Sequence, residues 1–105
     1  MAKYKVVWPD EAKADLKNSY TYYKEKSLQG AKNVITDIRK APKTIVFPKQ
    51  SQIEPYNARY RRILVRNYKV LYRVDEEENI LYVFGIIGMS QNPKEIKNID
   101  NYFDR

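Results

Sequence analysis

The side chains best suited to chemistry in this sequence are six cations that lie close together between residues 55 and 74. This stretch, called the basic segment below, contains no acidic residue, whereas the rest of the chain holds fourteen basic and thirteen acidic residues. Clustered Lys and Arg neutralise phosphates, and Tyr side chains among them can stack on bases. The basic segment therefore predicts a surface that binds nucleic acid or another acidic target, formed by Arg59, Arg61, Arg62, Arg66, Lys69 and Arg73.

A second interpretation of the basic segment is phosphodiester cleavage. Such a reaction needs a base, an acid and stabilisation of the charge that develops on the phosphate. Arg61, Arg62 or Arg73 could stabilise that charge, but Arg stays protonated and is no base. Lys69 could act as the base if neighbouring cations lower its pKa, and a tyrosine could donate a proton. These residue types permit cleavage without requiring it.

A third interpretation is purely structural, namely a solvated sheet face whose cations deter edge-to-edge association. The tyrosines Tyr68, Tyr72 and Tyr82 likewise suit half-buried strand positions in a core. Alternate residues of a strand share a face, so Lys69 and Arg73 can join basic residues of the preceding strand on one surface. The register decides whether Arg61 or Arg62 belongs to that set, and the sequence leaves this open.

The composition excludes several other kinds of site. The 105 residues include no cysteine and no histidine, which removes disulfides, thiolate metal sites and the commonest general base. The acidic run over residues 75–78 is typical of a solvated turn, because adjacent carboxylates do not converge on a metal ion. With three glycines there is no glycine-rich phosphate loop. We therefore expect neither a metal nor another cofactor.

Length, charge and hydropathy bound the type of protein. A chain of this length is typical of one domain, which we expect to span residues 1–105. The net charge of +7 favours an acidic partner. No apolar run approaches the roughly 20 residues that span a bilayer, and the N-terminus lacks the apolar run of a signal peptide. We expect a cytoplasmic protein that has no membrane partner.

The elements that must position these side chains follow from the hydrophobic spacing. Residues 4–8 form a β-rich run that stops at a proline, which predicts a short strand. Apolar residues at three- and four-residue steps predict helices over about residues 9–26 and 28–41. An irregular, proline-containing connection over residues 42–57 follows, with one more helical turn expected around residues 43–47.

Three β-rich runs complete this part of the chain, over residues 58–65, 68–74 and 80–87. Arg66-Asn67 predicts a tight hairpin turn in which Asn adopts positive φ, and residues 75–79 predict a second turn. The last run is apolar throughout its first half, so we expect that strand to be central and buried on both faces. The predicted fold is α+β: an N-terminal strand, a two-helix hairpin and a three-stranded antiparallel meander. The helices are expected on one face of a single four-stranded antiparallel sheet.

The basic segment also resembles the RelE/ParE superfamily of type II toxin–antitoxin toxins. Its members have an Arg-rich strand, a short turn and a second strand that ends in Tyr-Arg-Val-Asp, and the matching stretches here are Tyr60 to Val65 and Asn67 to Asp75. The start of the first helix fits as well, with Ala12, Asp15 and Leu16. The resemblance covers roughly residues 4–92.

The resemblance implies a growth-inhibiting toxin, often acting in plasmid stabilisation, that a cognate antitoxin neutralises with an acidic or amphipathic C-terminal segment. RelE-like members cleave ribosome-bound mRNA without metal or cofactor, whereas ParE-like members inhibit DNA gyrase and cleave nothing. The double Arg followed by Ile-Leu-Val favours the ParE-like alternative slightly. A basic nucleic-acid or protein-binding module without toxicity is a third alternative.

The resemblance also implies roles for single residues. Lys69 falls where RelE-like enzymes carry an essential Arg, and Arg61 falls at a basic position of the first strand, so both are catalytic candidates if the protein is a nuclease. Ser90 stands where those enzymes carry a catalytic Arg, which counts against cleavage. Tyr102 is the candidate for their C-terminal Tyr.

Overall fold

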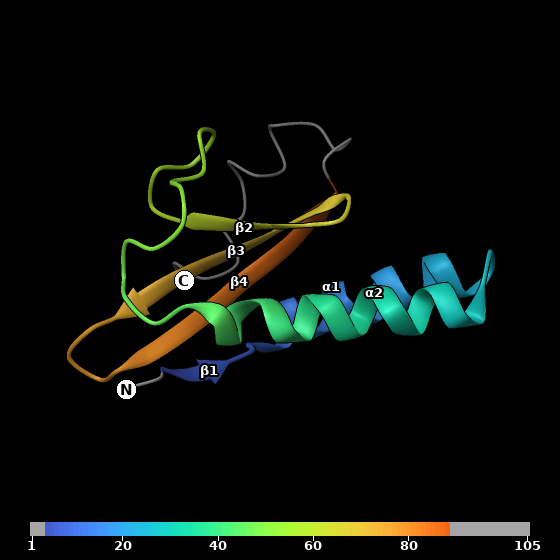
Figure 1. The fold of residues 1–105 in the computed structure, drawn as a ribbon, viewed down its shortest axis with the longest axis horizontal. Coiled ribbons are helices and arrows are strands. Elements are labelled where there is room, and N and C mark those ends of the chain that lie inside the picture. The colour runs from blue at the N-terminus through green and yellow to red at the C-terminus, as the bar shows by residue number, and fades with distance from the viewer. Residues whose placement is uncertain (1–3, 89–105) are drawn as a thin grey trace.

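The computed structural model describes residues 4–88, which form one four-stranded sheet and a helical hairpin (Figure 1). This is the predicted α+β arrangement. The elements follow in the order β1 (Lys5–Val7), α1 (Asp10–Lys24), α2 (Leu28–Lys40), the 3₁₀ turn η1 (Ala41–Thr44), β2 (Arg61–Val65), β3 (Tyr68–Asp75) and β4 (Ile80–Gly88).

Both helices begin where local chemistry favours a helix start. Pro9 precedes α1, and Asp10 and Glu11 lie in its first turn, where carboxylates interact favourably with the helix dipole. Ser27 caps α2, because its hydroxyl accepts a hydrogen bond of 3.0 Å from the N–H of Gly30. The extra helical turn lies earlier than predicted, directly after α2, because Pro42 suits the first turn of a new helix.

The sheet has the strand order β1-β4-β3-β2. The meander is antiparallel as predicted, and β4 is central with both neighbours paired. The prediction of a fully antiparallel sheet is wrong, because β1 pairs with β4 in parallel, with Lys5 opposite Ile80. A three-residue strand at the sheet edge carries no pattern that fixes its direction, and the helical hairpin and the β2–β3 hairpin return the chain into β4 in the direction of β1.

Strand β2 is shorter than the predicted run over residues 58–65. The N–H of Tyr60 donates to the carbonyl of Asn57 (3.1 Å), and the carbonyl of Tyr60 accepts from the N–H of Glu54 (2.9 Å). The first bond closes a turn over residues 57–60, and the second belongs to a single bridge between the loop and the start of β2. The preceding loop is joined to the strand by an isolated antiparallel bridge between Ile53 and Arg61.

The two hairpin turns differ from the predicted conformation at one position. Arg66, and not Asn67, adopts positive φ (53°), while Asn79 does so in the second turn (58°). An Arg in the left-handed region is uncommon, because its Cβ crowds the backbone there.

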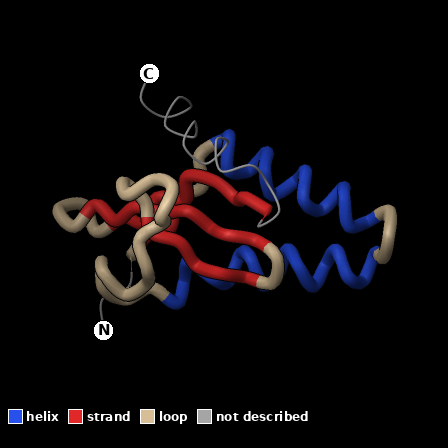
Figure 2. Tube along the Cα trace, turned by 90° about the horizontal axis from the view of Figure 1, so that it is seen from above, coloured by secondary structure: helices blue, strands red, loops and turns tan. Residues whose placement is uncertain are grey.

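The main core lies between the helices and one face of the sheet. Figure 2 shows α1 and α2 side by side, joined by a short loop, on one side of the sheet. They contribute Leu16, Val34 and Ile38 to a cluster that includes fully buried Tyr72 and Val83 of the sheet. A smaller cluster lies on the opposite face and consists of Tyr60, Leu71 and Ile87 with Phe84 packed against it. As predicted, Tyr72 is a core residue, and Tyr68 and Tyr82 are half-buried.

Candidate functional site

The strand register assigns the cations of the basic segment to two faces. Arg61 lies opposite Tyr72, so its side chain belongs to the face that the helices cover. Arg62 lies opposite Leu71, on the open face, which Lys69 also shares. Arg73 lies opposite Tyr82, beyond a bulge in the β3–β4 pairing, on the open face. Arg62, and not Arg61, is therefore the first-strand residue that shares a face with Lys69 and Arg73.

Lys69 is buried in an ion pair. Its ammonium Nζ lies 3.3 Å from each carboxylate oxygen of Glu54 and donates a hydrogen bond to Oε1. The side chain of Glu54 is fully buried, and that of Lys69 is 11% exposed. The N–H of Tyr56 donates to Glu54 Oε1 (3.2 Å), and the ring of Tyr56 lies 5.3 Å from the ammonium. The ammonium of Lys69 is therefore enclosed by its carboxylate partner and is not presented to a ligand at the surface.

Sequence reasoning missed Glu54. It is the only acidic residue between Asp37 and Asp75, and it lies in a proline-containing loop that was predicted to be irregular. The one available signal was a single carboxylate preceding a stretch with six cations. The burial of that carboxylate follows from the loop's path along β2, where the carbonyl of Gln52 accepts a hydrogen bond of 2.9 Å from the N–H of Arg62.

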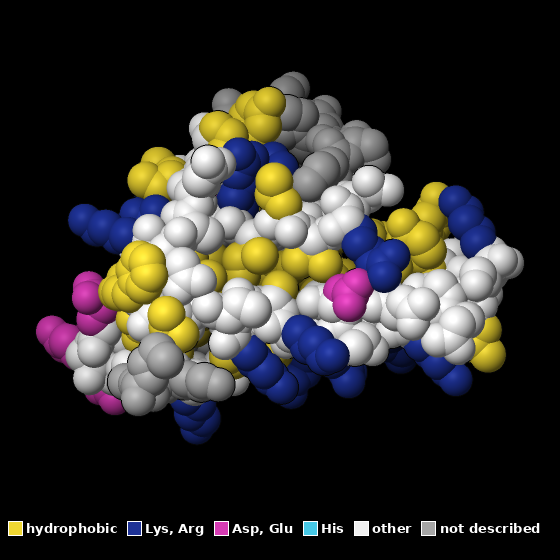
Figure 3. Space-filling model, in the orientation of Figure 1, with side chains coloured by type: hydrophobic (Ala, Val, Ile, Leu, Met, Phe, Trp, Pro, Cys, Tyr) yellow, Lys and Arg dark blue, Asp and Glu magenta, His cyan; other side chains and the backbone are white. Residues whose placement is uncertain are grey.

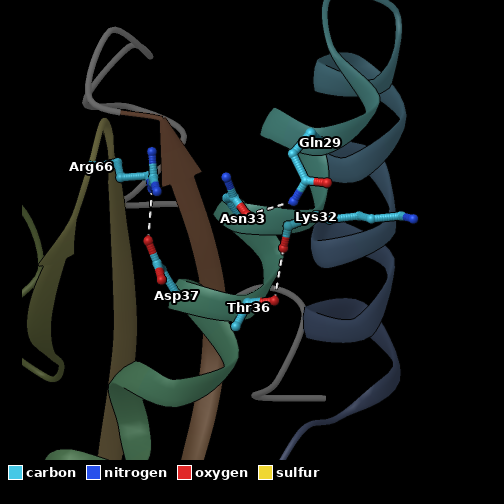
Figure 4. Close-up of polar contacts among 6 residues, drawn as sticks. All are labelled: Gln29, Lys32, Asn33, Thr36, Asp37 and Arg66. Carbon is cyan, nitrogen blue, oxygen red and sulfur yellow. Dashed lines mark hydrogen bonds and ion pairs between the residues drawn. The ribbon is translucent and has the colours of Figure 1, made fainter.

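Arg66 is also paired with a distant acid. Its Nε lies 2.8 Å from the carboxylate of Asp37, which joins the β2–β3 turn to α2 (Figure 4). The two side chains are 48% and 45% exposed, so water screens this pair. Arg66 and Lys69 are thus neutralised by acids from outside the basic segment.

Arg61 and Arg62 bind the loop beside them in different ways. Arg61 donates a hydrogen bond of 2.6 Å to the carbonyl of Ser51, and the hydroxyl of Ser51 contacts the hydroxyl of Tyr72. Arg62 donates to the side-chain oxygen of Gln52 (3.2 Å). Both arginines are half-buried, and within residues 4–88 neither forms an ion pair.

A cleft forms where β2 begins, and it gathers a second set of cations. We call it the cationic cleft; its volume is about 260 Å³. The basic-segment residues Arg59, Arg61 and Arg73 line it together with Lys49, which lies outside that segment. Arg73 also lies over the ring of Phe84, at 5.9 Å from the ring centroid. The structure thus brings three of the six predicted site residues together and separates Arg62, Arg66 and Lys69 from them.

A larger groove of about 920 Å³ follows the helical hairpin, and we call it the helical groove. Its apolar residues are Trp8, Leu16, Tyr20 and Ile35. All its charged residues are cations, namely Lys13, Lys17, Lys32, Arg39 and Lys43. Figure 3 shows Lys and Arg side chains along the helical part of the face in view. The signal in the sequence is a pair of lysines, Lys13 and Lys17, that lie one helical turn apart on α1.

One carboxyl group of α1 is held against the sheet. Asp15 accepts a hydrogen bond of 3.2 Å from the N–H of Ile86 in β4. Burial raises the pKa of Asp15 above its ordinary value, an effect that the hydrogen bond from Ile86 opposes.

Other features bear on the predicted chemistry. Among residues 4–88, no group of His, Cys, Asp and Glu side chains is arranged to hold a metal ion. In the same range, no helix combines the length and the apolar character needed to cross a bilayer. Glu76, Glu77 and Glu78 are exposed in the predicted turn. Ser90 and Tyr102 lie outside the described residues.

Comparisons with known proteins identify the family to which this chain belongs. A family model for the ParE toxin of type II toxin–antitoxin systems (parDE) matches residues 6–93. The chain is similar to a structure of the chromosomal ParDE toxin–antitoxin system from P. aeruginosa, with a TM-score of 0.70 and 17% identity over 86% of this chain and 100% of that one. No curated protein sequence is significantly similar to this chain.

A second structure with a similar fold also comes from a toxin–antitoxin complex. The chain is similar to one in the RelBE2 toxin–antitoxin complex from Mycobacterium tuberculosis, with a TM-score of 0.53 and 15% identity over 87% of this chain and 97% of that one. At these identities the two structures establish a shared fold alone.

Proposed function

This chain belongs to the ParE toxin family of type II toxin–antitoxin systems, and on that premise we propose that it inhibits growth by binding DNA gyrase without cleaving RNA. The observation that carries the proposal is the buried pair of Lys69 and Glu54. Lys69 is the one cation of the basic segment that could serve as a general base, and it is buried against Glu54, out of reach of a substrate at the surface. A binding mechanism needs no such base.

The alternative of ribosome-dependent mRNA cleavage requires groups that converge on one phosphate. Of its two candidate residues, Arg61 lines the cationic cleft at the end of the sheet, whereas Lys69 is buried on the opposite face and does not line that cleft. This separation favours the binding mechanism over the nuclease. A binding module without toxicity is the remaining alternative, and only an assay of growth or of the target distinguishes it.

The test compares two activities of the purified chain. We expect it to inhibit DNA supercoiling by gyrase and to leave ribosome-bound message intact. The double variant Lys69→Met with Glu54→Gln removes both charges and the candidate base together, and it should still inhibit gyrase. Cleavage of ribosome-bound message by the natural chain, lost in the double variant, would overturn the proposal. An absence of both activities would favour the non-toxic module.

We also propose that the cognate antitoxin places an acidic, amphipathic segment in the helical groove. The similar structures from P. aeruginosa and Mycobacterium tuberculosis are described as a toxin–antitoxin system and a toxin–antitoxin complex. The groove supplies an apolar floor and charged groups of one sign, which match a segment with apolar residues on one side and carboxylates on the other.

A charge reversal tests this placement. Lys17→Glu in the groove should weaken neutralisation by the protein encoded next to this gene, so that co-expression no longer restores growth. Lys40→Glu makes the same charge change at an exposed position outside the groove and should leave neutralisation unchanged. Equal neutralisation of both variants would place the antitoxin elsewhere.

A further inference from the structure

The cationic cleft exists because the two strands of the hairpin have unequal lengths. Strand β2 begins at Arg61, opposite Tyr72, whereas β3 continues to Asp75. Past Tyr72, the edge of β3 therefore has no β2 partner, and the loop from Lys49 to Ile53 forms the other side of the opening. The cleft is a product of the backbone path and needs no rearrangement to open.

One guanidinium group at the cleft is fixed in place. Arg61 donates to the carbonyl of Ser51 (2.6 Å), and Ser51 in turn contacts the hydroxyl of Tyr72, which is fully buried. A guanidinium group has five N–H donors, so this bond orients the group without exhausting its donors. Fixing the side chain before a ligand arrives lowers the entropy lost on binding.

Among residues 4–88, the other charged side chains that line the cleft are also cations. Lys49, Arg59 and Arg73 are exposed at its rim. Within residues 4–88, Lys49, Arg61 and Arg73 form no ion pair, in contrast with Arg66 and Lys69. The acidic residues Glu76 and Glu77, which follow β3, do not line the cationic cleft; they line a separate hollow to which Arg73 also contributes.

From these observations, we propose that the cationic cleft binds a phosphate group. Arg61 presents a planar, pre-oriented donor, and Lys49 and Arg73 add charge from two further segments, which is the combination that recognises phosphate oxygens. The ligand is either a small free phosphate or a phosphodiester of a nucleic-acid backbone. The inference goes beyond the proposed function, because inhibition of a protein target requires no phosphate site.

Binding is measured with the purified full chain and two probes. Inorganic phosphate is titrated calorimetrically, and a fluorescently labelled single-stranded oligonucleotide of mixed sequence is titrated by anisotropy. Binding of phosphate with no tighter binding of the oligonucleotide assigns the site to a small phosphate. Tighter oligonucleotide binding that weakens with salt assigns it to the backbone. Binding of neither probe overturns the proposal.

Two cleft variants and two matched controls locate the binding. Lys49→Met and Arg73→Met remove charge at exposed positions, so the fold should be retained. Each should weaken binding of the effective probe by about tenfold, because each removes a charge-assisted contact to a phosphate oxygen. Lys24→Met and Lys40→Met remove the same charge at exposed positions away from the cleft and should change affinity less than twofold. Equal losses in all four variants would show a general charge effect and overturn the site.

Discussion

The two ends of the β2–β3 hairpin carry the same kinds of side chain in different surroundings. At the turn end, Lys69 and Arg66 are paired with carboxylates that come from the preceding loop and from α2. At the open end, Arg61 and Arg73 line a cleft, and within residues 4–88 they have no carboxylate partner.

This difference shows that a run of like charges in a sequence does not by itself form a binding site, because folding can pair some of these charges with distant acids. The acids that neutralise the turn end, Asp37 and Glu54, lie 29 and 15 residues away from their partners. The added cation at the open end, Lys49, also comes from outside the basic segment. Folding therefore pairs two cations with carboxylates at the turn end of the hairpin, and it brings one additional cation, Lys49, to the open end.

Breaking the buried pair is expected to have the largest effect. Lys69→Met leaves the fully buried carboxylate of Glu54 without its counter-charge, which should lower the free energy of unfolding by about 3–5 kcal/mol. Urea denaturation at neutral pH measures this loss. Adding Glu54→Gln should restore most of the stability, because the uncompensated charge is gone. A Lys69→Met variant as stable as the natural chain would contradict the burial of this pair.

The contact that supports Arg61 is expected to come next. Ser51→Ala removes the hydroxyl beside that of Tyr72, which is fully buried, and should cost about 1–3 kcal/mol if the tyrosine hydroxyl is left without a partner. Tyr72→Phe in the same background should recover part of the loss, since no buried donor is then unsatisfied. A thermodynamic cycle of the two single variants and the double variant measures the coupling, and additive losses would argue against the contact.

The exposed pair at the turn should matter least for stability among the three polar contacts. Arg66→Ala removes the ion pair to Asp37, and because both side chains are nearly half exposed the loss should be about 0.2–1 kcal/mol. The loss should shrink further as salt is added. A loss as large as that of Lys69→Met would erase the distinction between the two pairs.

The smallest effect concerns the carboxyl group held against β4. Because the folded chain raises the pKa of Asp15 above 3.8, protonated Asp15 is favoured in the fold, and this contribution is lost as pH rises through the folded pKa. Asp15→Asn keeps an oxygen for the N–H of Ile86 and cannot ionise. Its melting temperature should match the natural chain at about pH 3 and exceed it slightly at about pH 7. Asp10→Asn, at an exposed position of the same helix, should show no such gain.

Much of the fold follows from local patterns in the sequence. Periodic apolar residues such as Leu16 and Ile38 correctly predicted both helices, and the predicted ends lie within two residues of those in the structure. The continuous apolar run from Ile80 correctly identified the central strand. The predicted antiparallel direction of β1 was wrong. The direction in which a strand pairs depends on the path by which the chain returns to the sheet, and not on the composition of three residues.

The candidate site was less accessible to sequence reasoning. The strand register places Arg61 and Arg62 on different faces of the sheet. This register depends on the turn geometry and on the bridge from Ile53, and neither can be recognised from the spacing of side chains in the sequence. The burial of Glu54 depends on the path of a loop without periodicity. Patterns along the chain identify which charges are present, whereas their partners depend on tertiary contacts.

The parallel contact of β1 with β4 constrains the order in which this sheet can be completed. The edge strand near the N-terminus pairs with Ile80 to Tyr82, so its ladder closes over more than seventy residues of intervening chain. During synthesis, residues 5–7 cannot pair with β4 before that strand has been made. A nascent chain therefore keeps its first strand without its sheet partner until residues 80–82 have left the ribosome.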